Sequence, residues 1–335
     1  MTHKIQETNS LSAEEFHNEV LPKGKPLVIR GLVNDWPIVK AGKAGAVEFC
    51  NYLKRFDRDL PINTVTGPPS INGRIFYNSD MSGLNCRIGS EKLSASLNYL
   101  LEHKDDSPAP TLAIQSTLVS QYLPGMQLEN RLNLLPESIG QRIWIGGKTV
   151  VAAHYDTSEN IACCLAGKRR FTLFPPSQIA NLYIGPLEFT PSGATISLVD
   201  FDKPDYEKYP NFKIAEEHAL QAELEPGDAI YIPYLWWHHV ASLESINALM
   251  NYWWTGSDEQ FGEARNALLL AMMSIKNLPD NQKQAWQEVF NHYVFSQHDI
   301  QSHIPKARRG ILGDLTPDIL RSLRQTLVRA LSRLN

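Results

Sequence analysis

From Arg142 to Trp254 the chain is a succession of short apolar runs separated by turn signals. Gly146-Gly147 is a two-residue hairpin signal between two of these runs, and Ala166-Gly167-Lys168 is a second tight turn. Glu225-Pro226-Gly227-Asp228 makes a turn before another run, which Pro233 ends. Short strands with turns at this spacing favour an antiparallel sandwich or barrel. The predicted strands are Arg142–Ile145, Lys148–Tyr155, Asn160–Leu165, Arg169–Phe174, Ala229–Ile232, Val240–Leu243 and Ala248–Trp254.

The segments before this region carry other signals. Ser12 and Glu15 have the spacing of a capping box, so we expect a short helix there, ended by Pro22. Residues 25–33 are apolar and β-branched, which predicts a strand, and residues 60–90 predict one or two hairpins with loops.

After Gly256 the apolar residues change to helical spacing. A last helix is predicted to begin at Thr316, the N-cap, with Pro317 in its first turn. One face of this helix carries Ile319, Leu320, Leu323, Leu327, Leu331 and Leu334. We therefore expect a mainly β domain over residues 1–256, with an N-terminal helix, and a helical region over 257–335.

Composition and charge restrict the class of protein. The chain has 335 residues, of which 43% are hydrophobic, so it can bury a sizeable core. Its net charge is −4, whereas nucleic-acid-binding domains are typically basic. Cysteines at 50, 86, 163 and 164 fit neither a zinc ribbon nor a disulfide framework. The first ten residues lack the apolar stretch of a signal peptide, and Ala267–Met273 is too short to span a bilayer. We expect a cytoplasmic protein with reduced thiols and no membrane or nucleic-acid partner.

His154-Tyr155-Asp156 is an H-x-D sequence at the end of a predicted strand. Residues i and i+2 of a strand point to the same face, so one imidazole and one carboxylate converge there. One further ligand completes the facial triad of non-heme Fe(II) oxygenases, which leaves positions open for a cosubstrate and O₂. His238 and His239 follow a later strand and offer that ligand. Adjacent residues of a strand face opposite sides, so one of the two is expected to bind.

Several segments, in order, resemble the Jumonji-C (cupin-like) oxygenases, which depend on Fe(II) and 2-oxoglutarate. They are His154–Pro176, Val199–Phe212 and Asp228–Ser242, and the stretch Lys25–Pro37 is similar to the family's N-terminal strand and turn. The likeness covers about residues 25–256. Within the family it is nearest to the asparaginyl hydroxylase that inhibits hypoxia-inducible factor.

The resemblance implies a mainly β fold, a double-stranded β-helix or jelly roll, with flanking helices. It implies that iron is bound by His154, Asp156 and the first histidine of the later pair, His238, and that these residues carry the catalysis. It also implies 2-oxoglutarate as cosubstrate, with Arg169 at the position whose basic residue holds the distal carboxylate. The related hydroxylase has lysine there, and an arginine fork binds a carboxylate as well.

Other pocket residues follow from the same likeness. Asn160 and Asn251 match polar pocket positions, and Gln115 matches a glutamine beside the pocket or the substrate. Trp253 shares a strand face with Asn251 and is expected to wall the pocket. Two departures stand out, because the hydroxylase has a threonine and a tyrosine where this chain has Val151 and Ala113.

These residues predict an oxygenase that hydroxylates a protein side chain or a small molecule and releases succinate and CO₂. The alternatives are a cupin metal enzyme that does not use 2-oxoglutarate, or a non-catalytic binding module stabilised by a metal. The leucine-rich face of the last helix needs a covering surface, and the related hydroxylase dimerises through such helices. We therefore expect a homodimer formed by the C-terminal helices, with the arginines of that region on a solvated face.

Overall fold

The computed structural model describes residues 3–191, 193–256 and 258–333. The chain divides into two compact units, Met1–Thr255 and Gly256–Asn335. Among the described residues, the first unit holds all the strands and the hydrophobic core clusters, and the second is helical.

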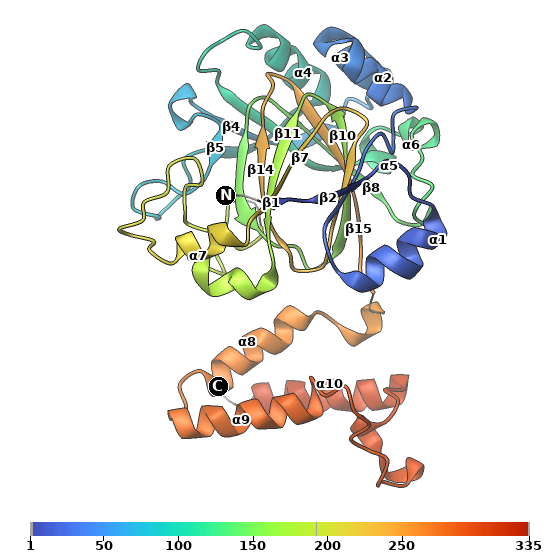
Figure 1. Ribbon diagram of the computed structural model, residues 1–335, viewed down its shortest axis with the longest axis vertical. Coiled ribbons are helices and arrows are strands. Elements are labelled where there is room, and N and C mark those ends of the chain that lie inside the picture. Colours follow the sequence, from blue (N-terminus) through green and yellow to red (C-terminus); the bar gives the residue numbers. More distant parts are fainter. Residues whose placement is uncertain (1–2, 192, 257, 334–335) are drawn as a thin grey trace. The chain divides into compact units, whose positions relative to one another are not determined.

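Two β-sheets face each other in the first unit (Figure 1). This arrangement confirms the predicted mainly β, jelly-roll fold. The nine-stranded sheet has the order β2 (Gln6–Thr8), β3 (Leu27–Ile29), β13 (Ala229–Ile232), β10 (Glu159–Ala166), β15 (Asn247–Trp254), β8 (Gln141–Gly146), β7 (Thr111–Leu118), β4 (Pro61–Gly67) and β6 (Arg87–Lys92). The six-stranded sheet has the order β1 (His3–Lys4), β12 (Leu220–Leu224), β11 (Arg169–Phe174), β14 (Trp237–Ser242), β9 (Val150–His154) and β5 (Arg74–Ile75).

The hairpin predicted at Gly146-Gly147 is wrong. Strands β8 and β9 lie in different sheets, because β15 and β7 occupy both edges of β8. The turn at Ala166-Gly167-Lys168 is tight as predicted, but it too carries the chain from one sheet to the other. From β8 onward the chain crosses to the opposite sheet at every connection except the long one from β11 to β12, so the short turns close a sandwich instead of pairing neighbours.

These crossings give the sandwich two distinct ends. At the closed end, short turns over residues 147–149, 167–168, 225–228 and 243–246 join the strands. At the open end the connections cover residues 155–158, 175–219 and 233–236. The longest of them carries α7 (Phe212–Glu217) and a 3₁₀ helix, Pro176–Asn181.

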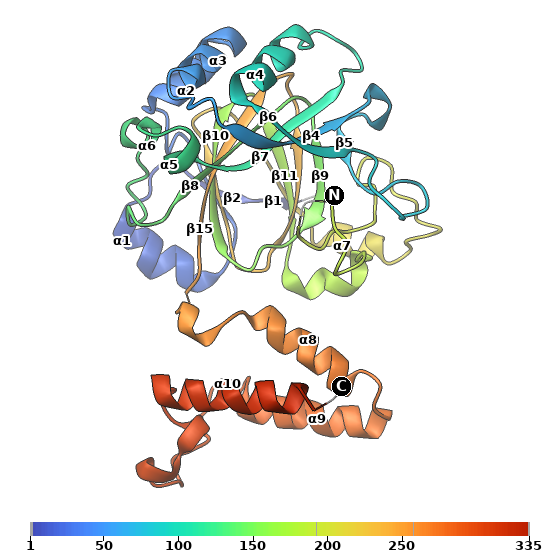
Figure 2. The ribbon, with the colours of Figure 1, turned by 180° about the vertical axis from the view of Figure 1, so that it is seen from behind.

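Two apolar layers stabilise this unit. The interior between the sheets is filled by side chains from both, among them Phe171, Leu173, Ile230 and Leu249. The outer face of the nine-stranded sheet is covered by helices, which Figure 2 shows from behind. These helices are α2 (Pro37–Ala44), α3 (Ala46–Lys54), α4 (Leu93–Glu102), α5 (Val119–Tyr122) and α6 (Met126–Glu129).

The N-terminal signals are largely confirmed. Ser12 caps α1 (Ala13–Glu15), and Glu15 completes the capping box. Pro22 does not end the helical run, which continues as a π turn and a 3₁₀ turn and ends at Gly24, φ +55°. Proline is tolerated in the first turn of that 3₁₀ segment because no donor is needed there. In the region 60–90, β4 and β6 pair antiparallel, with β5 between them in sequence.

The second unit consists of α8 (Ala264–Ile275), α9 (Asp280–Tyr293) and α10 (Pro317–Leu331), with short 3₁₀ turns between them. Thr316 caps α10 as predicted. Of the apolar residues predicted on one face of this helix, Leu320 is buried, whereas Leu327 and Leu331 are exposed; Leu334 lies outside the described residues. Across the described chain, no helix is both long and apolar enough to span a bilayer.

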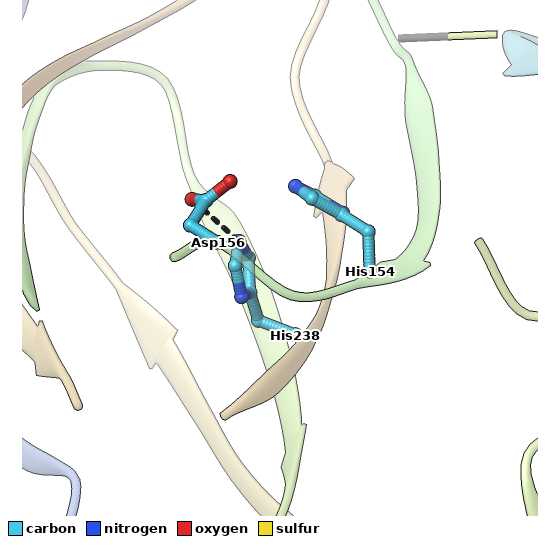
Figure 3. Close-up of side chains that lie close together, drawn as sticks. All are labelled: His154, Asp156 and His238. Carbon is cyan, nitrogen blue, oxygen red and sulfur yellow. Dashed lines mark ion pairs between the residues drawn. The ribbon is translucent and has the colours of Figure 1, made fainter. Parts of the chain in front are cut away.

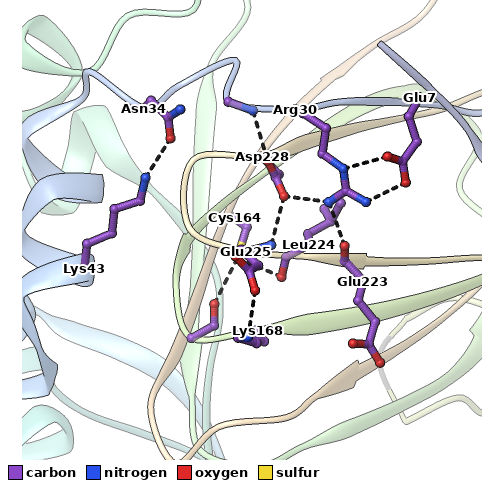
Figure 4. Close-up of polar contacts among 12 residues, drawn as sticks. Glu7, Arg30, Asn34, Lys43, Cys164, Lys168, Glu223, Leu224, Glu225 and Asp228 are labelled. Atoms are coloured by element: carbon purple, nitrogen blue, oxygen red, sulfur yellow. Dashed lines mark hydrogen bonds and ion pairs between the residues drawn. The ribbon is translucent and has the colours of Figure 1, made fainter. Parts of the chain in front are cut away.

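Asp228, in the turn before β13, ties the closed end to the N-terminal strands (Figure 4). Its carboxylate accepts hydrogen bonds from the Arg30 guanidinium at 2.7 Å, the Gly31 amide at 2.9 Å and the Glu225 amide at 3.1 Å. Arg30 also forms an ion pair with Glu7 at 2.6 Å. The Asp228 side chain is only 13% exposed, whereas that of Glu7 is 42% exposed.

We predict that Asp228→Ala lowers the free energy of unfolding by about 1–3 kcal/mol, because it removes one acceptor that three partly buried or exposed donors share. Glu7→Ala is the control and should cost less than about 1 kcal/mol, since it removes an exposed ion pair. Urea denaturation followed by circular dichroism measures both. An equal loss in the two variants would contradict the central role of Asp228.

Candidate metal centre

Two histidines and an aspartate meet at the open end of the sandwich (Figure 3). His154 is the last residue of β9, and Asp156 follows just beyond the strand. His238 lies on β14 directly opposite His154 in the antiparallel register. One potential ligand atom from each residue lies within 4.8 Å of the others, and the two imidazole centroids are 4.1 Å apart.

Local backbone structure sets this geometry. The pairing of β9 with β14 contains a bulge, so that His238 faces His154 while Val240 faces Val151. Because His238 and Val240 share a strand face, the bulge also places Val151 and His154 on one face. The amide of Leu235 donates a hydrogen bond to the Asp156 carbonyl at 3.1 Å and holds the segment after β9.

Hydrogen bonds orient both imidazoles for metal binding. The Nδ1 atom of His154 lies 3.0 Å from the Ala152 carbonyl, and that of His238 lies 3.0 Å from the Trp236 carbonyl. A carbonyl only accepts, so Nδ1 carries the proton and the lone pair of Nε2 is free. Burial, with a contribution from nearby His154, lowers the pKa of His238 to about 4. The imidazole is therefore neutral at physiological pH, which is the form that binds metals.

His239 lies on the other face of β14. Its ring stacks on Phe201 with centroids 4.8 Å apart. Burial lowers its pKa to about 4, and Arg170 and Arg74 contribute to the shift. The structure thus brings His238, and not His239, to His154 and Asp156.

Two imidazoles and one carboxylate form the donor set of a facial triad. Asp156 lies 3.6 Å from Nε2 of His238 and is 24% exposed, so solvent reaches the carboxylate side of the cluster. Such a set suits Fe(II) better than the harder ions that prefer only oxygen ligands, and it leaves coordination positions open. The residues present therefore fit a catalytic iron.

Arg169, the first residue of β11, lies at the closed end and points into the interior. It is opposite Ser242, and Leu173 on the same strand is opposite His238, so all four share the inner face. Arg169 is 7% exposed, and burial lowers its pKa to about 10. Within the described residues its guanidinium has neither a hydrogen bond nor an ion pair, whereas both neighbours are paired, Lys168 with Glu225 and Arg170 with Glu223.

The other predicted pocket residues come from the opposite sheet. Asn251 donates a hydrogen bond to Asn160 at 2.9 Å, and its own carbonyl oxygen is buried without a donor in the described chain. Trp253 pairs with Asn160 in register, and its indole N–H is buried without an acceptor there. Gln115, on β7, is half-buried. These positions thus bring buried polar atoms to the interior, and a bound ligand could satisfy them.

The positions that depart from the related hydroxylase also lie near this interior. Val151 packs against the apolar side chains between the sheets, and Ala113 lies opposite Gly146. Neither side chain can donate a hydrogen bond. The structure therefore contains no hydroxyl at these two positions.

Sequence reasoning missed two inward-facing residues of β8. Trp144 lies opposite Leu249, and its buried indole N–H has no acceptor among the described residues. Arg142 lies opposite Asn251. Both alternate with Ile143 and Ile145, which pack in the outer core. That alternation is visible in the sequence and could have identified the pair.

Comparison with known proteins identifies relatives. The sequence matches the cupin-like domain family over residues 12–260. It is 28% identical over 241 residues to JmjC domain-containing protein D of Dictyostelium discoideum, covering 69% of this chain and 52% of the relative. It is 37% identical over 269 residues to tRNA wybutosine-synthesizing protein 5 of Mus musculus, covering 75% and 77%.

Lysine-specific demethylase 8 of Xenopus tropicalis is 23% identical over 247 residues, covering 73% of this chain and 51% of the relative. The chain spans about half the length of several curated relatives that it matches. The similarity therefore concerns the shared domain, not the whole of those proteins.

We predict that His238→Ala abolishes stoichiometric iron binding while His239→Ala retains it, because only His238 faces His154 and Asp156. Iron per folded protein, measured by elemental analysis after anaerobic loading, tests this. Circular dichroism controls for the loss of packing at either buried site. Iron loss in His239→Ala alone would mean that the register of β14 is shifted by one residue.

Proposed function

This chain belongs to the cupin-like domain family, and on that premise we propose that it is an Fe(II)- and 2-oxoglutarate-dependent oxygenase of the Jumonji-C type. One observation carries the proposal. A His₂–carboxylate cluster and a buried, unpaired arginine share the inner face of one sheet. A metal and an anionic cosubstrate account for both features together.

The metal ligands have defined roles in this proposal. His154, Asp156 and His238 would hold the iron. Iron with these cosubstrates supplies the oxidising chemistry. In the balanced reaction one oxygen atom enters a C–H bond of the substrate, and the other enters succinate as CO₂ leaves 2-oxoglutarate.

Arg169 takes the distal carboxylate of 2-oxoglutarate. Leu173, four residues further along β11, lies opposite His238. Four residues of a strand span about 13 Å, a distance that a five-carbon diacid and an extended arginine side chain bridge together. Burial deprives the Arg169 guanidinium of hydration, and the carboxylate would supply a compensating negative charge. An arginine can bind both oxygens of a carboxylate.

Polar atoms of the opposite sheet complete the proposed pocket. The Trp144 and Trp253 indoles offer donors where Val151 and Ala113 offer none. The unpaired Asn251 carbonyl and the partly buried Gln115 lie on the same side of the sandwich. We infer that these groups replace the missing hydroxyls in orienting the cosubstrate.

The substrate is proposed by class. The resemblance to the asparaginyl hydroxylase that inhibits hypoxia-inducible factor favours a protein side chain, and a small molecule is the alternative. Relatives named for lysine demethylation and for tRNA modification show that the domain is used on different substrates.

A second candidate function is favoured by Val151 and Ala113. A cupin that uses the same three ligands without 2-oxoglutarate, or a metal-stabilised binding module, would not need hydroxyls at these positions. Arg169 opposes both, because neither explains a buried cation without a partner. Release of succinate with Fe(II) and 2-oxoglutarate distinguishes the oxygenase from either alternative.

Arg169→Leu should raise the KM for 2-oxoglutarate about 10- to 100-fold with iron stoichiometry intact. A charge-assisted hydrogen bond contributes about 1.5–3 kcal/mol, which corresponds to this range. The assay measures succinate release against 2-oxoglutarate concentration. Arg170→Leu is the matched control, because Arg170 pairs with Glu223 outside the pocket. An unchanged KM in the Arg169 variant would remove the cosubstrate anchor from the proposal.

We also propose that the second unit forms a homodimer. Its helices leave large apolar side chains exposed, among them Leu268, Met273, Trp286, Tyr293, Val328 and Leu331. Complete burial of one such side chain is favourable by about 1.5–3 kcal/mol, so a surface that covers several of them is strongly favoured. A second copy is the simplest partner, since a two-fold interface buries the same face on both chains.

Light scattering of the full-length chain should give a dimer at micromolar concentration. A truncation after Asp314 removes α10 and should give a monomer or an aggregate. A full-length monomer over the same concentrations would contradict the dimer. A dimeric truncation would place the interface outside α10.

A further inference from the structure

Arg142 is a charged residue of the interior that the proposed chemistry does not use. It is the second residue of β8, and the short closed-end turn that joins β8 to β9 places it at the same end as His154. Its partner in register is Asn251, whose own neighbour Ala162 packs in the interior. Directly opposed residues share a face, so the Arg142 side chain points inward at the open end.

One strained position holds this side chain. Nη1 of Arg142 donates hydrogen bonds to the Ser116 carbonyl at 3.0 Å and to the Ser116 hydroxyl at 3.3 Å. Ser116 lies in the irregular part of β7, between Ile114 and Thr117, with φ +46°. Non-glycine residues rarely adopt this conformation. The unusual backbone of Ser116 thus supplies two acceptors to the Arg142 guanidinium. Among the described residues this guanidinium has no carboxylate partner.

The inward-facing arginines outnumber the carboxylates of the site. On the described strands β8–β15 the inward positions carry Arg142 and Arg169 and no carboxylate; Asp156, just beyond β9, is the acidic group of the site. With iron and 2-oxoglutarate bound, the cosubstrate and Asp156 together would offset the metal and Arg169. Arg142, half-buried at the open end, would then be the inward-facing cation left without a carboxylate.

We propose that Arg142 is a specificity-determining residue that binds a carboxylate of the substrate and so selects a substrate with an acidic group near the reacting C–H bond. This inference rests on the proposed oxygenase function and names the substrate class of the same site. A single carboxylate balances the remaining charge and fits the planar fork of a guanidinium. The acidic group belongs to a peptide side chain or to a small organic acid, two sources with the same chemistry.

The test measures retention on the iron-loaded, full-length protein with 2-oxoglutarate, kept anaerobic. One arm is a pool of short peptides that contain one Asp or Glu, matched by a pool with Asn or Gln at the same positions. The other arm is a set of small aliphatic carboxylic acids, matched by their primary amides. Mass spectrometry of the retained fraction reports which ligands bind. Retained compounds are then tested for succinate release in air.

In either the peptide pool or the set of small acids, the acidic ligands should be retained about 10- to 100-fold more strongly than their amide counterparts. This is the range expected for a charge-assisted hydrogen bond. Arg142→Gln should abolish this preference, and Arg142→Lys should restore part of it. Both variants should keep the wild-type iron content and the wild-type KM for 2-oxoglutarate. Arg170→Gln removes the same charge on the outside of the sandwich and should behave as wild type.

Equal retention of acids and amides by the wild-type protein would overturn the proposal. So would a preference that survives in Arg142→Gln, or a raised KM for 2-oxoglutarate in that variant, which would make Arg142 a cosubstrate residue. If an RNA oligonucleotide were retained and neither set of carboxylic acids were, Arg142 would bind phosphate and not a carboxylate. Acid-selective retention without succinate release would instead refute the oxygenase function and leave the Arg142 site standing.

Discussion

The antiparallel register between β9 and β14 is the constraint on which the site depends. It sets His154 opposite His238, and the bulge beside this pair turns the end of β9 so that Asp156 can reach the same point. A shift of one residue would exchange His238 for His239, whose buried ring stacks on Phe201 on the outer face of the sheet. Because both faces of β14 are packed, such a shift would also expose apolar side chains. Packing and metal geometry therefore select the same register.

The interior also contains buried polar groups that have no hydrogen-bond partner among the described residues. Most buried polar groups in proteins are hydrogen-bonded, and a buried charge without a partner is costly. Arg169, the Asn251 carbonyl and two indole N–H groups nonetheless find no partner among the described residues of this largely apolar interior. Such an arrangement costs stability, and in the proposed oxygenase the anionic cosubstrate would offset that cost, because a ligand that binds only the folded state stabilises it.

The sequence predicts these features unequally. Capping at Ser12 and Thr316, the short strands and the H-x-D pair rest on local chemistry and are found as expected. Gly146-Gly147 marks a real turn, yet a turn signal does not say whether the next strand pairs with the last one or crosses to another sheet. That choice depends on β7 and β15, which are far away in sequence. Alternation in the sequence places Arg142 on the same strand face as Trp144, opposite the apolar Ile143 and Ile145, and the strand order then shows that this face points to the interior.

The closed end explains why Arg169 can occupy its position. Gly167 adopts φ +67°, and a Cβ there would lie 2.4 Å from the Asn247 side chain, so only glycine allows the turn that starts β11. Asn247 donates hydrogen bonds to the carbonyls of Gly147 and Glu244, and the Leu243 amide donates one to the Lys168 carbonyl, so hydrogen bonds connect three crossing turns. The direction of Arg169 into the barrel is therefore fixed by backbone contacts among turns, not by a partner for its charge. In the proposed oxygenase, a closed end that positions a cation and an open end that positions metal ligands would together set the orientation of a ligand before any chemistry occurs.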